Sequence, residues 1–219
     1  MSTPQRTART ISYVLNPLVL PPVLFAGVVW LAGAEPSSVL IAAGITLVFF
    51  AVVPLVPMII AVRARPGTTL ELRDRLQRTV PYAVGIGSYL VCIPILKAAE
   101  LPAQQVLVGM MVCFILNGAL LMVINLFWKI SLHVSTLAGC FSILAYVVAA
   151  LISPEYVRVD LPIGAVLLAA ALFTGTLMWA RVKDEAHTVS QVLAGAAFGA
   201  ILPLVVLSTL DYLGLFDTF

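Results

Sequence analysis

Long apolar segments separated by short polar ones dominate this chain of 219 residues. A helix needs about 20 apolar residues to cross a hydrocarbon core roughly 30 Å thick. Segments of about this length cover residues 11–32, 38–62, 81–97, 103–127, 134–152, 163–179 and 188–207. The sequence therefore predicts an all-α fold, a polytopic transmembrane helical bundle with six to seven spanning helices.

The composition agrees with a protein that lies in lipid. Hydrophobic residues make up 62% of the chain and charged residues only 10%, whereas soluble domains carry about 25% charged residues. We interpret residues 1–219 as one transmembrane domain of an integral membrane protein. The three cysteines, Cys92, Cys113 and Cys140, all fall in apolar segments without metal-ligand spacing and are predicted to be small buried side chains.

Proline marks the first two apolar segments as irregular. Asn16-Pro17 and Pro21-Pro22 are expected to bend the beginning of the first helix, and Pro54 and Pro57 predict a kink or a break in the second. If one of these segments is re-entrant, the bundle has six spans; otherwise it has seven.

Three polar islands separate the apolar segments and carry most of the charge. We call residues 63–80 the basic connector, residues 129–133 the first histidine island and residues 179–191 the second histidine island. The connector contains Arg63, Arg65, Arg73, Arg75 and Arg78.

The distribution of Lys and Arg predicts the orientation. With a cytoplasmic N-terminus and seven spans, ten of the twelve Lys and Arg residues lie inside, as the positive-inside rule requires. We therefore expect a protein of the plasma membrane with the N-terminus and all three islands at the cytoplasmic face. The C-terminus is then outside.

The only two histidines of the chain, His133 and His187, lie in the histidine islands beside fixed positive charge. On a helix, residues four apart share a face, so Lys129 is expected to pair with His133 and Gln191 with His187. Together with Arg181, this arrangement favours a site for a polyanion such as phosphate or diphosphate. One histidine could then attack phosphorus while the other protonates the leaving group.

The spacing of these residues resembles the signatures of a known family of membrane enzymes. Arg181, five residues, His187, three residues and Gln191 resemble the third signature of the type 2 phosphatidic acid phosphatase superfamily, which reads Ser-Arg, five residues, His, three residues, Asp. Ile130-Ser131-Leu132-His133 resembles its second signature, Pro-Ser-Gly-His. Residues 74–81 lie where the first signature belongs. The resemblance covers about residues 73–207, and residues 1–33 form an additional N-terminal helix.

The resemblance implies a metal-independent lipid phosphate hydrolase without a cofactor. In such an enzyme His187 forms a phospho-histidine, His133 is the general acid, and Gln191 replaces the Asp that supports the nucleophile. The residues that bind phosphate are then Arg181, Lys129, Ser131 and either Arg75 or Arg78. The expected partners are membrane lipids and a lipid or isoprenoid (di)phosphate substrate, and no nucleic acid.

Two other functions fit the same residues. The pocket could hold an isoprenoid diphosphate while its chain is cyclised or transferred, although the Asp-rich motifs that hold magnesium are absent from the sequence. Alternatively, the protein could bind or transport lipid without catalysis.

Small and polar residues within the spans predict helix packing. Gly195 and Gly199 form a Gly-x-x-x-Gly motif, which predicts close packing either within one chain or in a homodimer. Asn117 and Asn125 are expected to form hydrogen bonds between helices.

Overall fold

Six helices are long and apolar enough to cross a membrane in the computed structural model, which describes residues 3–64, 76–151 and 161–216. The predicted helical membrane bundle is thus confirmed. The first is a continuous segment made of α3 (Pro36–Leu47), the π-helical turn η1 (Val48–Val52) and α4 (Val53–Ala64). The others are α5 (Thr79–Ala98), α6 (Gln104–Phe127), α7 (Leu132–Tyr146) with its π-helical extension η3 (Val147–Leu151), α8 (Ile163–Lys183) and α9 (Val189–Tyr212).

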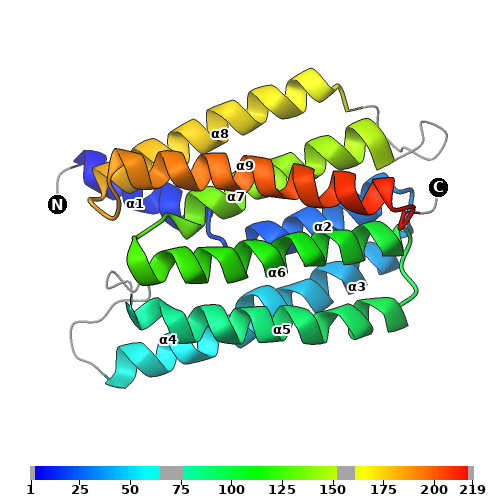
Figure 1. Cartoon of the computed structure of the whole chain (residues 1–219), viewed down its shortest axis with the longest axis horizontal. Helices are drawn as coiled ribbons and strands as arrows, with labels where there is room; N and C mark the ends of the chain where they lie inside the picture. The colour runs from blue at the N-terminus through cyan, green and yellow to red at the C-terminus, as the bar shows by residue number, and fades with distance from the viewer. Residues whose placement is uncertain (1–2, 65–75, 152–160, 217–219) are drawn as a thin grey trace.

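These helices run up and down along one long axis (Figure 1). The α6–α7 loop, the α8–α9 loop and the N-terminus lie at one end, together with the ends of α4 and α5 that flank the basic connector. The chain reaches its C-terminus at the other end. The two histidine islands and the described ends of the basic connector therefore share one end of the bundle, as the topology predicted.

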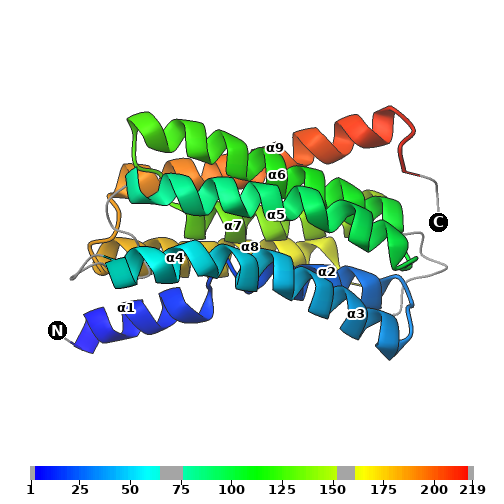
Figure 2. The ribbon, with the colours of Figure 1, turned by 90° about the horizontal axis from the view of Figure 1, so that it is seen from below.

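The first apolar segment is not one helix, and the predicted helix over residues 11–32 is wrong. The chain forms α1 (Thr3–Val14) and the shorter apolar helix α2 (Leu20–Leu31), joined by a turn over residues 15–19 (Figure 2). Pro17 disfavours a helical conformation at the residue before it. The Asn16 side chain accepts a hydrogen bond from the Leu18 N–H at 2.9 Å and closes the turn.

The second apolar segment contains the predicted irregularity. The π-helical turn η1 directly precedes α4, which contains Pro54 and Pro57. Proline lacks the N–H of a regular helix, and its ring clashes with the carbonyl four residues earlier, here that of Phe50. The wider turn accommodates this clash, and the Phe50 ring stacks on Tyr89 of α5 with centroids 4.2 Å apart.

The close contact between α7 and α9 depends on the Gly-x-x-x-Gly motif. A Cβ atom at Gly195 would lie 2.8 Å from the carbonyl oxygen of Ser131, and one at Gly199 would clash with the carbonyl of Ser135. Both glycines therefore pack within one chain, the first of the two uses that the motif predicted. The homodimer stays a prediction that a single chain does not test.

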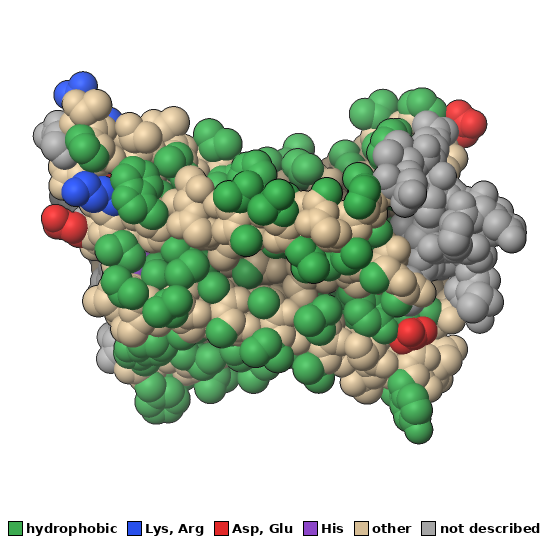
Figure 3. Space-filling view, turned by 90° about the horizontal axis from the view of Figure 1, so that it is seen from above, with side chains coloured by type: hydrophobic (Ala, Val, Ile, Leu, Met, Phe, Trp, Pro, Cys, Tyr) green, Lys and Arg blue, Asp and Glu red, His purple; other side chains and the backbone are tan. Residues whose placement is uncertain are grey.

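Two further predictions about the interior are confirmed. The cysteines are free and buried. Asn117 of α6 accepts a hydrogen bond from the Ser135 hydroxyl of α7 at 3.0 Å. The interhelical hydrogen bond that was expected of Asn125 stays a prediction. Figure 3 shows the outer surface that results, with apolar side chains along the length of one face and charged side chains towards its ends.

Candidate functional site

A cavity of about 270 Å³ lies inside the end of the bundle that carries the polar islands. Its walls come from the α1–α2 turn, α4, α5, α6, α7 and the α8–α9 region. Four of the predicted site residues line it together: Arg78, His133, Arg181 and His187. Most of the remaining lining is apolar or aromatic, so the cavity has one polar region in otherwise apolar surroundings.

Arg181 and His187 are placed by the end of α8. Arg181 lies in the last turn of this helix and is only 1% exposed. Its carbonyl accepts hydrogen bonds from the N–H groups of Ala186 and His187, at 3.1 and 3.2 Å. Glu185 adopts a left-handed conformation, with φ of 55°, to close this turn. The five residues between Arg181 and His187 thus form the turn that ends α8, and this turn brings His187 back beside the Arg181 backbone.

Gln191 holds the His187 ring through the start of α9. Its Oε1 atom accepts from the Thr188 N–H at 3.2 Å and lies 3.1 Å from Nδ1 of His187. The backbone N–H of Gln191 donates to the Thr188 hydroxyl at 3.4 Å, which completes a capping box. Because the Thr188 N–H can only donate, the Gln191 atom is an acceptor, and Nδ1 of His187 must carry the proton. Nε2 of a neutral His187 is then left with its lone pair.

The surroundings of His187 favour this neutral form. Burial is the largest cause and, together with the positive charges of Arg78, Arg181 and Lys129, it lowers the pKa of His187 to about 3, against the opposing hydrogen bond to Gln191. The unfolded chain, with the ordinary value of 6.5, binds the proton more readily between these pH values. Stability that is present above pH 6.5 is therefore lost as the pH falls towards 3.

A carboxylate at position 191 is expected to reverse part of this effect. Gln191→Glu keeps the length of the side chain and the capping box but places a negative charge beside Nδ1. We expect the pKa of His187 to rise by about 1 to 3 pH units. Histidine-selective ¹⁵N NMR can follow the titration, since the chain has only two histidines. Gln191→Leu is the neutral control, and an unchanged titration in Gln191→Glu would mean that this side chain does not contact the ring.

His133 reaches the cavity from the first turn of α7. It is the second residue of this helix and lines the same cavity as His187. Ser131, at the N-cap position, is fully buried, and its hydroxyl has no hydrogen-bond partner within the described part of the chain. Ser131 does not line the cavity, so its predicted contact with phosphate stays a prediction.

Lys129 differs from the expected arrangement. Because α7 begins only at Leu132, Lys129 and His133 do not share a helix face, and that prediction is wrong. The Lys129 ammonium group instead donates to the carbonyl oxygen of Ala186 at 2.7 Å. Lys129 is not among the residues that line the cavity. It joins the two histidine islands, and its role as a direct phosphate ligand remains a prediction.

The basic connector contributes Arg78. This residue ends the 3₁₀ turn η2 (Leu76–Arg78), just before α5, and is 9% exposed at the cavity wall. The other candidate, Arg75, lies outside the described residues. Arg78 is thus the connector arginine that the structure places at the site.

Several residues that line the cavity were not predicted from the sequence. Tyr82, Gly85 and Tyr89 follow Arg78 along α5 at spacings of four, three and four residues and all line the cavity. This is the period of one helix face, a signal that was present in the sequence. Thr136 of α7 follows His133 by three residues and also lines the cavity.

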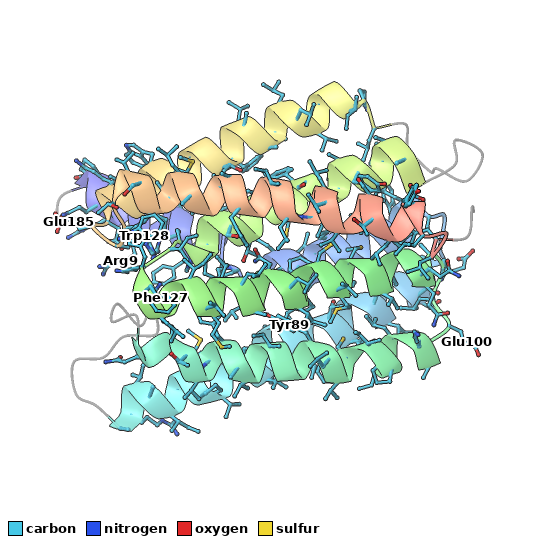
Figure 4. The ribbon with its side chains drawn as sticks, viewed as in Figure 1. Arg9, Tyr89, Glu100, Phe127, Trp128 and Glu185 are labelled. Atoms are coloured by element: carbon cyan, nitrogen blue, oxygen red, sulfur yellow. The ribbon has the colours of Figure 1, made fainter. Side chains whose placement is uncertain are left out.

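The N-terminal helix is linked to the same region. Arg9 of α1 forms an ion pair with Asp184, at 3.4 Å between the guanidinium nitrogen and Oδ1. Asp184 is the residue directly after α8, and its side chain is buried. In Figure 4, Arg9 lies at the same end of the bundle as Glu185, which belongs to the second histidine island, and Trp128, which directly precedes the first. The segment before α2 therefore covers one side of the site.

Within the described residues, no group of three or more His, Cys, Asp or Glu side chains is arranged to hold a metal ion. The chain matches no protein-family model, no curated protein and no solved structure.

Proposed function

We propose that this chain is a membrane-embedded phosphatase or diphosphatase that hydrolyses a lipid or isoprenoid (di)phosphate through a phospho-histidine. One observation carries the proposal: residues from three separate polar islands, Arg78, His133, Arg181 and His187, line a single cavity with otherwise largely apolar walls. The charge bias along the sequence supports a site at the cytoplasmic face of the plasma membrane.

The charges of the cavity suit a phosphate group. Its lining contains two guanidinium groups and two imidazoles, and no Asp or Glu among the described residues. Guanidinium groups donate paired hydrogen bonds to phosphate oxygens, and such bonds are stronger in a site that excludes water. An apolar tail would contact the remaining walls, so a phosphate bearing a hydrocarbon chain matches both regions.

The two histidines support a two-step reaction. Nε2 of His187 attacks phosphorus and forms an N–P bond while the P–O bond to the leaving group breaks, with its electron pair on the leaving oxygen. His133 takes a proton from the monoanionic substrate and gives it to that oxygen, and the lipid product leaves. His133 then takes a proton from water, whose oxygen attacks phosphorus and breaks the N–P bond. His133 passes the proton that it took from water to the product, inorganic phosphate leaves as the monoanion, and both histidines return to their initial states.

Gln191 can support this reaction only by orientation. It holds the His187 tautomer that the first step needs, but as an amide it does not stabilise the imidazolium form as a carboxylate would.

The proposal can be tested with purified protein in phosphatidylcholine vesicles that contain a long-chain alkyl phosphate or a prenyl diphosphate. We expect release of inorganic phosphate together with the unrearranged alcohol or monophosphate, both quantified by chromatography, with and without a chelator. Binding of the substrate without any turnover would contradict catalysis and favour a lipid-binding protein. A cyclised or transferred isoprenoid product would favour the other enzyme class.

A further inference from the structure

We infer that the hydrocarbon chain of the substrate leaves the cavity sideways into the bilayer, between the α1–α2 turn and α4. We call this opening the lateral portal; Pro17 and Leu18 line one side of it and Leu55 and Met58 the other. The inference rests on the proposed function for the phosphate head group. Its occupant is one alkyl or prenyl chain whose phosphate lies between Arg78 and Arg181.

Exposure differs between the polar and the apolar residues that line the cavity. Three of the four arginine and histidine residues that line the cavity are almost inaccessible from outside, since Arg181 is 1%, His187 7% and Arg78 9% exposed, and only His133 is partly exposed. By contrast, Tyr13 is 59% exposed, and the four side chains of the lateral portal are partly exposed. The accessible rim of the cavity is therefore its apolar side, which suits a chain that stays in lipid.

The backbone is irregular at, or directly before, each side of the lateral portal. One side is the non-helical turn over residues 15–19, and the other follows the π-helical turn η1 at Pro54. Irregular backbone at membrane depth is tolerated where it is buried in protein or lines a cavity. Insertions of π-helix in α-helices also occur frequently at functional sites. The α1–α2 turn and the residues of α4 that directly follow η1 line the same cavity, although they are far apart in the sequence.

The cavity extends deep into the bundle along α5. The cavity follows α5 from Arg78 to Tyr89, eleven residues apart, which corresponds to about 16 Å along a helix. Figure 4 places Tyr89 near the middle of the bundle, well away from Glu100 at the far end. The cavity thus extends to about half of a hydrocarbon core that is roughly 30 Å thick. Its deeper part lies where a tail, rather than a head group, belongs.

Gly85 keeps this path open. It lies between Tyr82 and Tyr89 on the cavity face of α5, where a Cβ atom would meet only the Tyr89 side chain, at 3.7 Å. Alanine would therefore fit, whereas a longer side chain would project into the cavity. Gly87 on the same helix has open space around it, is exposed and does not line the cavity.

Photo-crosslinking tests the lateral portal without requiring turnover. A benzophenone amino acid replaces Leu55 in one variant and Val56 in the other. Val56 is adjacent, 51% exposed and not part of the cavity lining, so it serves as the matched control. Each variant is placed in phosphatidylcholine vesicles with a radiolabelled long-chain alkyl phosphate and irradiated with and without excess unlabelled alkyl phosphate.

We expect labelling at position 55 to fall by about tenfold under tenfold excess competitor, as for a saturable site, and labelling at position 56 to show no saturable part. Equal, unsaturable labelling at both positions, in protein that still binds the alkyl phosphate, would overturn the lateral portal and leave the proposed function intact. Protein that binds no alkyl phosphate would overturn both.

A second pair of variants tests the path without a photoreactive group. Gly85→Leu is expected to weaken binding of the long-chain alkyl phosphate by about tenfold or more, because it overfills the cavity. Gly87→Leu is expected to bind like the wild type. Similar affinities for the two variants, both folded, would show that the chain does not pass Gly85.

Discussion

Replacing His187 by alanine is expected to lower phosphate release by about 10⁴-fold or more, as loss of a catalytic nucleophile or its supporting residue does in hydrolases. The reason is geometric, since Gln191 holds Nδ1 and leaves Nε2 of the buried His187 as the nucleophilic atom of the cavity. Release of phosphate from the vesicle-bound lipid, normalised to folded protein, measures the effect.

Binding separates the nucleophile from a merely structural histidine. The affinity of His187→Ala for the alkyl phosphate should stay within a few-fold of the wild type, because the two arginines remain. In the wild type, a rapid alkaline quench during turnover of a ³²P-labelled substrate should trap the label on His187. Undiminished release by the variant, or label on another residue, would contradict the assignment.

The second large effect is expected at Arg181. Arg181→Met keeps the apolar stem of the side chain but removes the guanidinium group. Loss of a buried charged partner reduces affinity by roughly 30- to 5,000-fold, and we expect binding of the alkyl phosphate to fall within this range. Equilibrium binding to vesicles of graded alkyl phosphate content gives the measurement. Arg181→Lys should retain part of the affinity, because an ammonium group is a point charge without the paired donors.

Lys183 provides the matched control. It lies two residues further along α8, at the same end of the bundle, but its side chain is exposed. Lys183→Met should change the affinity by about twofold or less, since exposed charges contribute little. Equal losses in Lys183→Met and Arg181→Met would indicate attraction to a charged surface rather than binding in the cavity. Thermal unfolding of both variants checks that Arg181→Met is folded.

The arrangement of the site followed in part from topology alone. Successive spans alternate in direction. The hydropathy pattern and the positions of the basic residues therefore predicted that one end of the bundle holds His133, His187, Arg78 and Arg181. This alternation cannot say how deep a side chain lies or which neighbour it contacts. Lys129 illustrates the limit: its contact with Ala186 depends on where α7 begins and on the shape of the α8–α9 loop.

The segment over residues 11–32 shows a second limit. Its hydropathy indicates lipid or a protein interior but not a continuous helix. The Asn16 side chain closes a turn between α1, which packs on α8, and α2, which packs on α3 and α7. The cavity exists because this turn, Pro54 and Gly85 come together from separate elements.

The sequence by itself therefore determined the membrane-spanning helices, the end of the bundle where charge collects and the spacing that returns His187 to Arg181. Each of these depends on local composition or on one turn of the chain. Only the tertiary structure decided that Lys129 joins two loops and that the cavity has its accessible rim on the apolar side. Those features depend on contacts between distant segments, whose geometry is set by packing rather than by any local pattern.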